Sequence, residues 1–362
     1  MSGHGIELID LTKRFGTLTA ADSLNLDIAD GEVLCLLGPS GCGKTTTLRM
    51  VAGLEEATSG EVRIAGRAVT NLPARERNVS MVFQFYALYP NQTVRENLAY
   101  PLHAESLSRR EIEQRVARVA ATLELDGLMD RPPDRLGEGE KQRVAVGRAI
   151  VRAPSCFLFD EPLSRLDVQL RETMRGQIKE VLTGLNKPTV IVTHDQLEAL
   201  TMADRIAVMR YGVLEQVATP HEVFTRPANL FVAGFIGTPQ MNLLPGHVDT
   251  SSSSEALFEL GPQSLRLPMN ESWKRLGDDA HVTVGVRPRN LELCSDPAPD
   301  TLSAHVDVLE PMGAEVLAHL LDGEHELRVV VQRGVGLQAG ERVNLRVSSS
   351  QLHVFGADEK RI

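Results

Sequence analysis

A short apolar run followed by a glycine-rich loop, at residues 33–46, constrains this chain more than any other feature of its sequence. Residues 33–37 (VLCLL) are all apolar, which is typical of a strand buried on both faces of a parallel sheet. The next residues match the pattern G-x-x-x-x-G-K-[ST] and are Gly38, Pro39, Ser40, Gly41, Cys42, Gly43, Lys44 and Thr45. Residues 46–52 can continue as a helix whose N-terminus faces the loop. The sequence therefore predicts a strand, a phosphate-binding loop and a helix in succession.

The residue types in this loop suit the binding of a nucleoside triphosphate. Glycines allow backbone N–H groups to close around phosphate oxygens with no Cβ in the way. Lys44 adds a positive charge for the β- and γ-phosphates, and Thr45 offers a hydroxyl to Mg²⁺.

Composition narrows the class of protein. A chain of 362 residues should hold two domains, perhaps three, and its net charge of −10 argues against a general nucleic-acid binder. The four cysteines include no C-x-x-C pair, so neither a zinc site nor a disulfide framework is indicated, and a reducing cytosol is the simple interpretation. Neither a signal peptide nor an apolar run long enough to span a membrane is visible, so a role at a membrane would need a partner.

Strands and helices alternate over the first two thirds of the chain. Strand-like segments occur at residues 6–11, 23–28, 60–64, 79–83, 156–159 and 189–192, and helix-like segments at 93–121 and 144–151. This alternation predicts a doubly wound α/β core. From about residue 240 the pattern changes to short alternating segments, which predict a small all-β, barrel-like second domain.

Polar residues follow three of the predicted strands. Asp160 and Glu161 end one of them, where Asp160 can hold Mg²⁺ through water and Glu161 can polarise an attacking water. His194 ends the next strand and can contact the γ-phosphate or steady that water. Gln84 ends a third strand, and its amide can reach Mg²⁺ or water.

An aromatic segment follows Gln84. Residues 85–90 read FYALYP in a chain with only 4% aromatic residues. The segment is either a core plug or an exposed docking patch.

These residues together resemble the nucleotide-binding subunits of ATP-binding cassette (ABC) transporters, over nearly the whole chain. By this resemblance residues 38–46 are the Walker A loop, ending at Thr46, residues 156–161 the Walker B strand, and residues 164–167 the D-loop with Asp167. Gln84 corresponds to the Q-loop glutamine and His194 to the switch histidine. Phe15 would stack on adenine with Ala20 beside it, and residues 86–90 would receive the coupling helix of a membrane partner. The resemblance implies ATP and Mg²⁺ as cofactors, with Lys44, Gln84, Glu161 and His194 in hydrolysis and Thr45, Gln84 and Asp160 around the metal.

Several stretches are more specifically similar to the ATPases of bacterial carbohydrate importers of the maltose and glycerol-3-phosphate type, among them residues 82–90, 202–209 and 231–244. This resemblance implies a nucleotide-binding domain at 1–235 with a helical subdomain at about 90–150, and an OB/TOBE-like regulatory β-barrel at 236–362. It also implies a homodimer on the cytoplasmic face of the membrane, two permease subunits docking near residues 86–90, an extracytoplasmic solute-binding protein acting indirectly, and no nucleic acid.

The signature segment departs from the family pattern L-S-G-G-Q. This chain has Leu136, Gly137, Glu138, Gly139 and Glu140. In the family, the serine hydroxyl and the backbone N–H groups at this helix start bind the γ-phosphate across a dimer. Gly137 therefore removes a hydroxyl group, and Glu138 adds a negative charge near the triphosphate of ATP, which is a tetra-anion. We expect reduced but real ATPase activity, with a smaller effect if the Glu138 carboxylate points to solvent.

Three other interpretations remain open at the level of sequence. The first is an importer ATPase for another solute, such as a polyamine, sulfate or iron. The second is an ABC-type protein acting on nucleic acid or ribosomes, which the acidic charge disfavours. The third is a non-catalytic regulatory subunit, suggested by Gly137 and Glu138.

Overall fold

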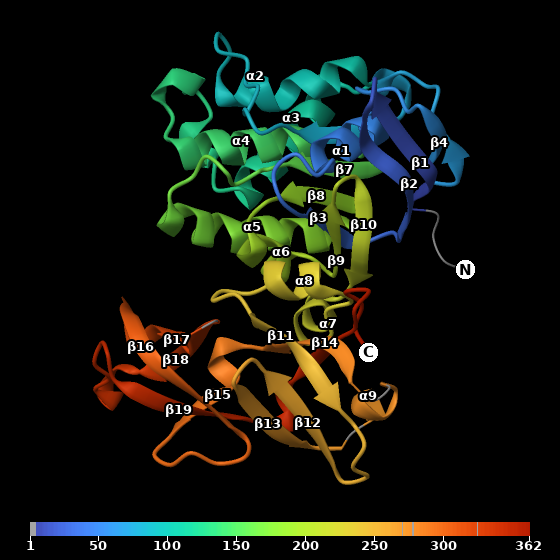
Figure 1. The fold of residues 1–362 in the computed structure, drawn as a ribbon. Coiled ribbons are helices and arrows are strands. Elements are labelled where there is room, and N and C mark those ends of the chain that lie inside the picture. Colours follow the sequence, from blue (N-terminus) through green and yellow to red (C-terminus); the bar gives the residue numbers. More distant parts are fainter. Residues whose placement is uncertain (1–4, 270, 277–278, 324) are drawn as a thin grey trace. The chain divides into compact units, whose positions relative to one another are not determined.

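The chain folds into two compact units, Met1–His221 and Glu222–Ile362 (Figure 1). The computed structural model describes residues 5–269, 271–276, 279–323 and 325–362. The sequence predicted a boundary between residues 235 and 236, whereas the two compact units divide between residues 221 and 222, within helix α7 (Pro220–Thr225).

A mostly parallel sheet is the centre of the first unit, as the alternating pattern predicted. Its strand order is β10-β9-β3-β8-β7-β6, with β10 antiparallel to its neighbour. The strands are β3 (Val33–Leu37), β6 (Val79–Val82), β7 (Cys156–Asp160), β8 (Thr189–Thr193), β9 (Arg205–Arg210) and β10 (Val213–Ala218). Every residue of β3, β7 and β8 is buried, which explains why these strands are continuous apolar runs.

A second, antiparallel sheet completes the β-structure of this unit, in the order β2-β1-β4-β5. Its strands are β1 (Ile6–Phe15), β2 (Leu18–Ile28), β4 (Ser59–Ile64) and β5 (Arg67–Ala68). Phe15 is the last residue of β1 and pairs with Leu18 of β2. Strand β1 pairs with both β2 and β4, so it is an inner strand of this sheet.

Helices follow the strands of the parallel sheet. They are α1 (Lys44–Ala52), α2 (Val94–Ala99), α3 (Arg109–Thr122), α4 (Glu138–Ile150), α5 (Val168–Leu185) and α6 (Gln196–Met202). The helix expected over residues 93–121 is divided into α2, a 3₁₀ turn (Tyr100–Ala104) and α3. Pro101 lies at the start of this 3₁₀ turn, and Ser108 begins α3 with a capping box to Glu111.

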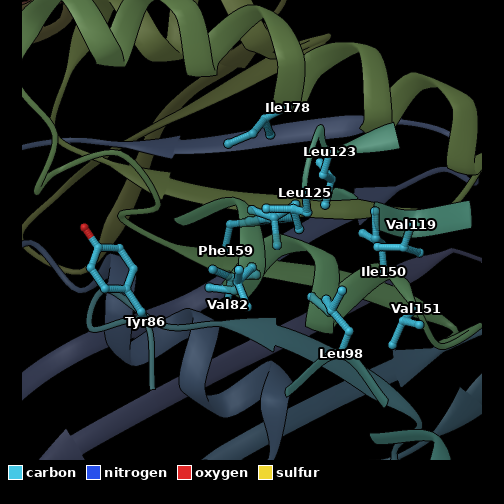
Figure 2. Packing of buried hydrophobic residues seen from close by; sticks show 14 of the residues in the cluster. Val82, Tyr86, Leu98, Val119, Leu123, Leu125, Ile150, Val151, Phe159 and Ile178 are labelled. Atoms are coloured by element: carbon cyan, nitrogen blue, oxygen red, sulfur yellow. The ribbon is translucent and has the colours of Figure 1, made fainter. Parts of the chain in front are cut away.

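Each face of the parallel sheet packs against a different layer. Phe157, Phe159 and Ile191 share a core with helices α2 to α5, and Figure 2 shows part of this cluster around Phe159 and Val82. The alternate residues Leu158 and Val190 face the other way, toward α1 and the antiparallel sheet. The period-2 alternation of a strand thus assigns neighbouring residues to two separate cores.

The second unit is almost entirely antiparallel β-structure. One sheet has the order β13-β12-β11-β14-β20 and the other β15-β19-β16-β17-β18. The elements are α8 (Leu230–Phe235), β11 (Asn242–Asp249), β12 (Glu255–Leu260), β13 (Gln263–Pro268), α9 (Glu271–Lys274), β14 (Ala280–Val286), β15 (Leu291–Cys294), β16 (Thr301–Met312), β17 (Glu315–Leu321), β18 (Glu326–Gln332), β19 (Arg342–Val347) and β20 (His353–Phe355), with α7 (Pro220–Thr225) at the junction of the units. The two sheets share one apolar core, which contains Trp273.

Contacts of residues 222–236 explain why the second unit begins before residue 236. Buried Arg287 donates to the carbonyl of Phe224 at 2.6 Å and to that of Ile236 at 2.8 Å. Ala233 of α8 packs against Met241 and Phe355. In the described part of the chain, none of the helices has the length and apolar character needed to cross a membrane.

Candidate functional site

The glycines of the phosphate loop are required by close packing of its backbone. A Cβ on Gly38 would lie 2.3 Å from the carbonyl oxygen of Met209, and a Cβ on Gly43 would lie 2.0 Å from that of Ala20. Gly43 also has a φ of 108° and stands immediately before α1. The loop therefore fits against β9 and β2 only with glycine at these positions, and α1 begins directly from it.

Lys44 lies inside the loop. Its side chain is 5% exposed, and its ammonium donates to the carbonyls of Gly38 and Pro39 at 2.8 Å each. An ammonium group held at this place can contact the terminal phosphates of a bound nucleotide.

Thr45 and Asp160 come together beside the loop. The Thr45 hydroxyl donates to Asp160 Oδ1 at 3.1 Å. Burial raises the pKa of the Asp160 carboxyl, and the hydrogen bond from Thr45 partly opposes this change. A hydroxyl and a carboxylate next to a phosphate loop are the ligand set that Mg²⁺ uses when phosphate and water supply the remaining positions. The residues present therefore fit Mg²⁺, although in the described residues no group of three or more His, Cys, Asp or Glu side chains could hold a metal without a substrate.

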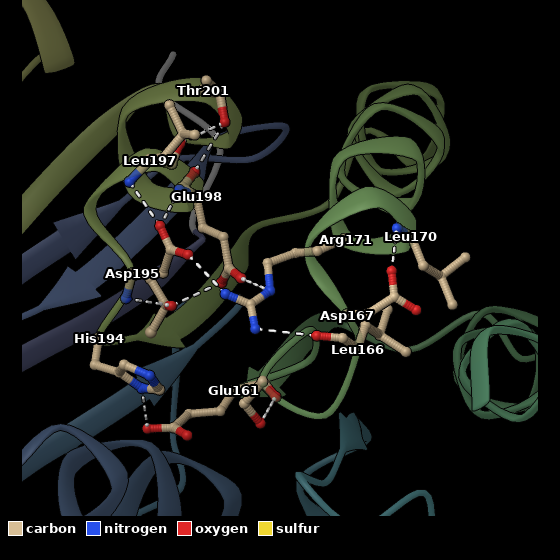
Figure 3. A network of polar contacts seen from close by, with 12 residues as sticks. Glu161, Leu166, Asp167, Leu170, Arg171, His194, Asp195, Leu197, Glu198 and Thr201 are labelled. Carbon is tan, nitrogen blue, oxygen red and sulfur yellow. Dashed lines mark hydrogen bonds and ion pairs between the residues drawn. The ribbon is translucent and has the colours of Figure 1, made fainter. Parts of the chain in front are cut away.

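Glu161 is the centre of a second cluster, where three strand ends meet. Gln84 donates from its amide to Glu161 Oε2 at 2.9 Å. His194 Nδ1 lies 3.1 Å from Glu161 Oε1 (Figure 3). Glu161 has a φ of 48°, which directs the chain sharply away from β7. The Ser164 hydroxyl donates to the Glu161 carbonyl at 3.0 Å. The sequence predicted that Gln84, Glu161 and His194 each end a strand. The structure shows that these strands, β6, β7 and β8, are neighbours in the sheet and that Gln84 and His194 both contact Glu161.

Sequence reasoning did not identify the network behind His194. Arg171 of α5 pairs with Asp195 at 3.1 Å and donates to the Leu166 carbonyl, also at 3.1 Å (Figure 3). It also lies 3.9 Å from Glu198, whose pKa is raised by burial. The arginine thus connects the start of α5 with the start of α6, and so connects residues 164–167 with the segment that carries His194. Asp195 carried a detectable signal, because an aspartate just before a helical segment is a typical N-cap, but nothing local marked Arg171.

A hollow of about 290 Å³ adjoins the phosphate loop. The predicted residues that line it are Phe15, Ala20, Ser40, Gly41, Gly43, Lys44, Thr45, Thr46 and Glu161, and the sequence analysis missed Leu18. Phe15 is 45% exposed, and the Lys13 ammonium lies 4.7 Å from its ring centroid. An exposed ring beside a phosphate loop can stack on a nucleobase.

Other predicted site residues lie outside this hollow. Pro39 and Cys42 belong to the loop without lining it, and neither residues 136–140 nor Asp167 line it. Asp167 instead caps α5 through the backbone N–H of Leu170. A larger hollow of about 740 Å³ lies among α3, α4 and α5, but none of the predicted site residues lines it.

The unusual signature segment forms an ordered start to α4. Gly137 is the N-cap residue, and the Glu140 carboxylate accepts a hydrogen bond from its backbone N–H at 2.8 Å. Glu138 accepts from the Tyr86 hydroxyl at 2.9 Å and from the Lys141 ammonium at 2.7 Å. Both unusual glutamates are thus bonded within their own protomer.

The aromatic segment after Gln84 has two kinds of residue. Tyr86 is 8% exposed and belongs to the helical core, so the core-plug interpretation applies to it. Phe85 lies under the guanidinium of Arg165. Because it is nevertheless 62% exposed, the docking-patch interpretation applies to it. Tyr89 is 37% exposed.

Three family models match the chain. Residues 21–164 match the family described as ABC transporter, residues 237–291 the MalK OB fold domain, and residues 284–355 the TOBE domain. The predicted α/β core and the predicted OB/TOBE-like β-domain are therefore confirmed.

Curated relatives and solved structures agree with these matches. The chain is 47% identical to the sn-glycerol-3-phosphate import ATP-binding protein UgpC of Cereibacter sphaeroides, over 98% of this chain and 99% of that protein. It is 44% identical to the lactose transport ATP-binding protein LacK of Rhizobium radiobacter, over 99% of each. A dimeric, post-hydrolysis structure of the ATP-binding cassette MJ0796 with ADP and Pi is 30% identical, with a TM-score of 0.54, over 59% of this chain and 98% of that one.

Proposed function

This chain belongs to the ATP-binding proteins of ABC transporters, and from that premise we propose that it hydrolyses ATP to drive the import of a sugar, a polyol or glycerol-3-phosphate. It is an ATPase of the importer type, since relatives along its full length are import ATP-binding proteins. The observation that carries the catalytic assignment is the contact of Glu161 with both Gln84 and His194, next to the phosphate loop.

Nucleotide binding is assigned to the hollow beside the loop. The loop's backbone N–H groups and Lys44 hold the phosphates, and Phe15 stacks on the adenine with Ala20 beside it. Thr45, Asp160 and Gln84 are the residues that would hold Mg²⁺. When bound, the metal would neutralise charge on the phosphate oxygens.

Hydrolysis is assigned to Glu161. Its carboxylate accepts a proton from the attacking water, while the contacts from Gln84 and His194 fix its position. Lys44 holds the γ-phosphate, and Arg171 positions the segment that carries His194.

The complete site requires two copies of the chain. Residues 136–140 and Asp167 lie outside the hollow of their own protomer. In a homodimer, the start of α4 would instead face the γ-phosphate bound by the partner, where its free N–H groups and dipole favour a negative group. The dimeric state of the similar solved structures supports this arrangement.

Coupling to transport is assigned to the segment after Gln84. Exposed Phe85 and Tyr89 suit a docking surface for two integral-membrane permeases. The protein would then work at the cytoplasmic face of the membrane, with an extracytoplasmic solute-binding protein acting through the permeases and with no nucleic acid involved. Names of relatives favour glycerol-3-phosphate or lactose-like solutes over polyamine, sulfate or iron.

The test is a variant that binds ATP without cleaving it. Glu161→Gln removes the proton acceptor but keeps the shape of the side chain, so hydrolysis should fall at least about a hundredfold. With Mg·ATP the variant should accumulate as a dimer in size-exclusion chromatography with light scattering. Glu113→Gln, which neutralises an exposed carboxylate on α3, is the matched control and should behave like the wild type.

Two outcomes would contradict the proposal. A Glu161→Gln protein that stays monomeric at saturating Mg·ATP would exclude the composite site. A wild-type protein without ATPase activity would favour the regulatory-subunit interpretation instead.

A further inference from the structure

Glu138 carries a negative charge at the start of the helix that is assigned to the partner's γ-phosphate. Its side chain is 49% exposed, so it has room to change rotamer. In the structure it is bonded to Lys141 at 2.7 Å and to Tyr86 at 2.9 Å. These two hydrogen bonds, that from Lys141 first, lower the pKa of the Glu138 carboxyl, which therefore stays charged at neutral pH.

Tyr86 is the more rigid of the two donors. Its ring is 8% exposed and packs in the core of helices α2 to α5, whereas the Lys141 side chain is 26% exposed. Figure 2 shows the Tyr86 hydroxyl pointing away from the other labelled side chains of this cluster. Arg148, near the far end of α4, donates to the backbone carbonyls of Tyr86 at 2.9 Å and Ala87 at 2.6 Å. Tyr86 is thus attached to α4 through both its hydroxyl and its backbone.

We propose that Tyr86 is a positioning residue that holds the Glu138 carboxylate against its own protomer and away from the triphosphate of the partner protomer. This inference rests on the homodimer of the proposed function. A glycine at residue 138 carries no such charge, so the Tyr86 hydroxyl has this role only because Glu138 is present. Through this contact the chain accommodates an acidic signature segment and remains an ATPase.

The same contact joins the docking segment to the signature helix. Gln84 contacts Glu161, Tyr86 follows two residues later, and Tyr86 contacts Glu138. Glu161 of one protomer is therefore connected to the start of α4, which is assigned to the partner's nucleotide. The connection consists of two side-chain contacts and the two peptide links between Gln84 and Tyr86. A displacement of residues 85–90 by a permease would act on both.

A double-mutant cycle tests the proposal. In the Glu161→Gln background, Tyr86→Phe should raise the ATP concentration needed for half-maximal dimerisation about three- to tenfold, within the range expected for the net contribution of one hydrogen bond. When Glu138→Gly is added to the background, Tyr86→Phe should change this concentration by less than about twofold. Tyr211→Phe, which removes a hydroxyl from an exposed tyrosine in the turn between β9 and β10, is the matched control.

A second readout separates charge from packing. Because the proposed effect is a repulsion between charges, the penalty of Tyr86→Phe should shrink when NaCl is raised from about 0.05 M to about 0.5 M. Glu138→Gln, which keeps an acceptor for Tyr86 but has no charge, should also remove the penalty and serves if Glu138→Gly does not fold.

The outcomes are decisive in each direction. A penalty of equal size with and without Glu138, or one that does not respond to salt, would show that Tyr86 acts only through packing and would overturn the inference. No penalty in the Glu161→Gln background would overturn it as well. If the Glu161→Gln protein itself does not dimerise with ATP, the proposed function fails first, and the inference fails with it.

Discussion

At the scale of single residues, Asp160 shows how a functional carboxylate can reduce the stability of the chain that carries it. It is 6% exposed, and burial raises the pKa of its carboxyl above the ordinary value. A carboxyl whose pKa is higher in the folded than in the unfolded state binds protons more readily when folded. Its contribution to stability is therefore present below the unfolded pKa and is lost as the pH rises through the raised pKa of the folded state.

Replacement of Asp160 by Asn should separate stability from function. At pH 7 and without nucleotide, Asp160→Asn should raise the melting temperature by about 2–4 °C, as expected for about 1 kcal/mol in a unit of this size. The same variant should lose the extra stability that Mg·ATP gives the wild type, because a metal ligand is missing. Thermal melts with and without Mg·ATP measure both effects.

The control for this experiment is Asp130→Asn, at an exposed carboxylate. It should change neither the melting temperature nor the response to Mg·ATP. A drop in the melting temperature of Asp160→Asn would show that the buried charge is well compensated, contrary to the argument above.

Residues that follow an apolar run were the ones that sequence could identify. Asp160, Glu161 and His194 each end a buried strand, and parallel strands bring their carboxyl ends to one edge. Arg171 lies in the first turn of a helix that had no special pattern, and its partner Glu198 lies 27 positions further along. Such a pair is specified by tertiary packing, which no local pattern reports. The contact between Tyr86 and Glu138 was missed for the same reason.

At the scale of elements, strand β20 contains a buried histidine that should make the second unit sensitive to acid. His353 is 9% exposed, and its Nδ1 is buried without a hydrogen-bond partner. Burial, together with the charges of Arg361 and Arg287, lowers the pKa of His353 to about 4. A base whose pKa is lower in the folded state contributes its full stability above the unfolded pKa of about 6.5 and loses it as the pH falls toward 4.

The second unit should therefore unfold more easily at pH 5 than at pH 7, by about 1–2 kcal/mol from His353. His353→Gln, which cannot titrate, should reduce this difference. The chain has one tryptophan, Trp273, which is fully buried in this unit, so its fluorescence during guanidinium unfolding reports the unit selectively. The measurement is the midpoint of that transition at the two pH values.

His305→Gln provides the comparison, since His305 is exposed on β16 of the same unit. It should leave the pH dependence unchanged. A His353→Gln variant with the same pH dependence as the wild type would assign the acid sensitivity to other groups.

Elements with a strong local pattern were predicted and the others were not. The short buried strands β3, β7 and β8 were identified from unbroken apolar runs. Helix α5 was missed, because only three of its residues are fully buried and its apolar stripe is correspondingly thin. The division of residues 93–121 was missed because Pro101 and Ser108 were not weighed as a stop and a start.

At the scale of the whole molecule, the order of domains was predictable but the limits of the second compact unit were not. The change of pattern at about residue 240 marks where short alternating strands begin. Residues 222–236 contain the end of α7 and all of α8, however, and join the second unit through Arg287, whose two carbonyl partners are distant in sequence. Long-range hydrogen bonds of this kind leave no periodic signal.

The last prediction concerns assembly with the membrane subunits. Phe85 follows Gln84 and is 62% exposed, with the guanidinium of Arg165 4.3 Å from its ring centroid. An exposed aromatic residue is the kind of anchor that dominates a protein interface, and a charge at its centre is costly to desolvate. We therefore expect Phe85→Asp to reduce co-purification of the two permeases by at least about tenfold.

The comparison that makes this result specific is Tyr211→Asp. Tyr211 is 79% exposed and, like Phe85, lies against an arginine, but it belongs to the turn between β9 and β10 and not to the docking segment. It should leave co-purification intact, while both variants should still dimerise with ATP in the Glu161→Gln background. If Phe85→Asp retains the permeases, or if RNA or DNA is recovered in their place, the docking assignment is wrong. Loss of ATP-driven dimerisation in Phe85→Asp would instead show that this residue acts on Gln84 within the catalytic site.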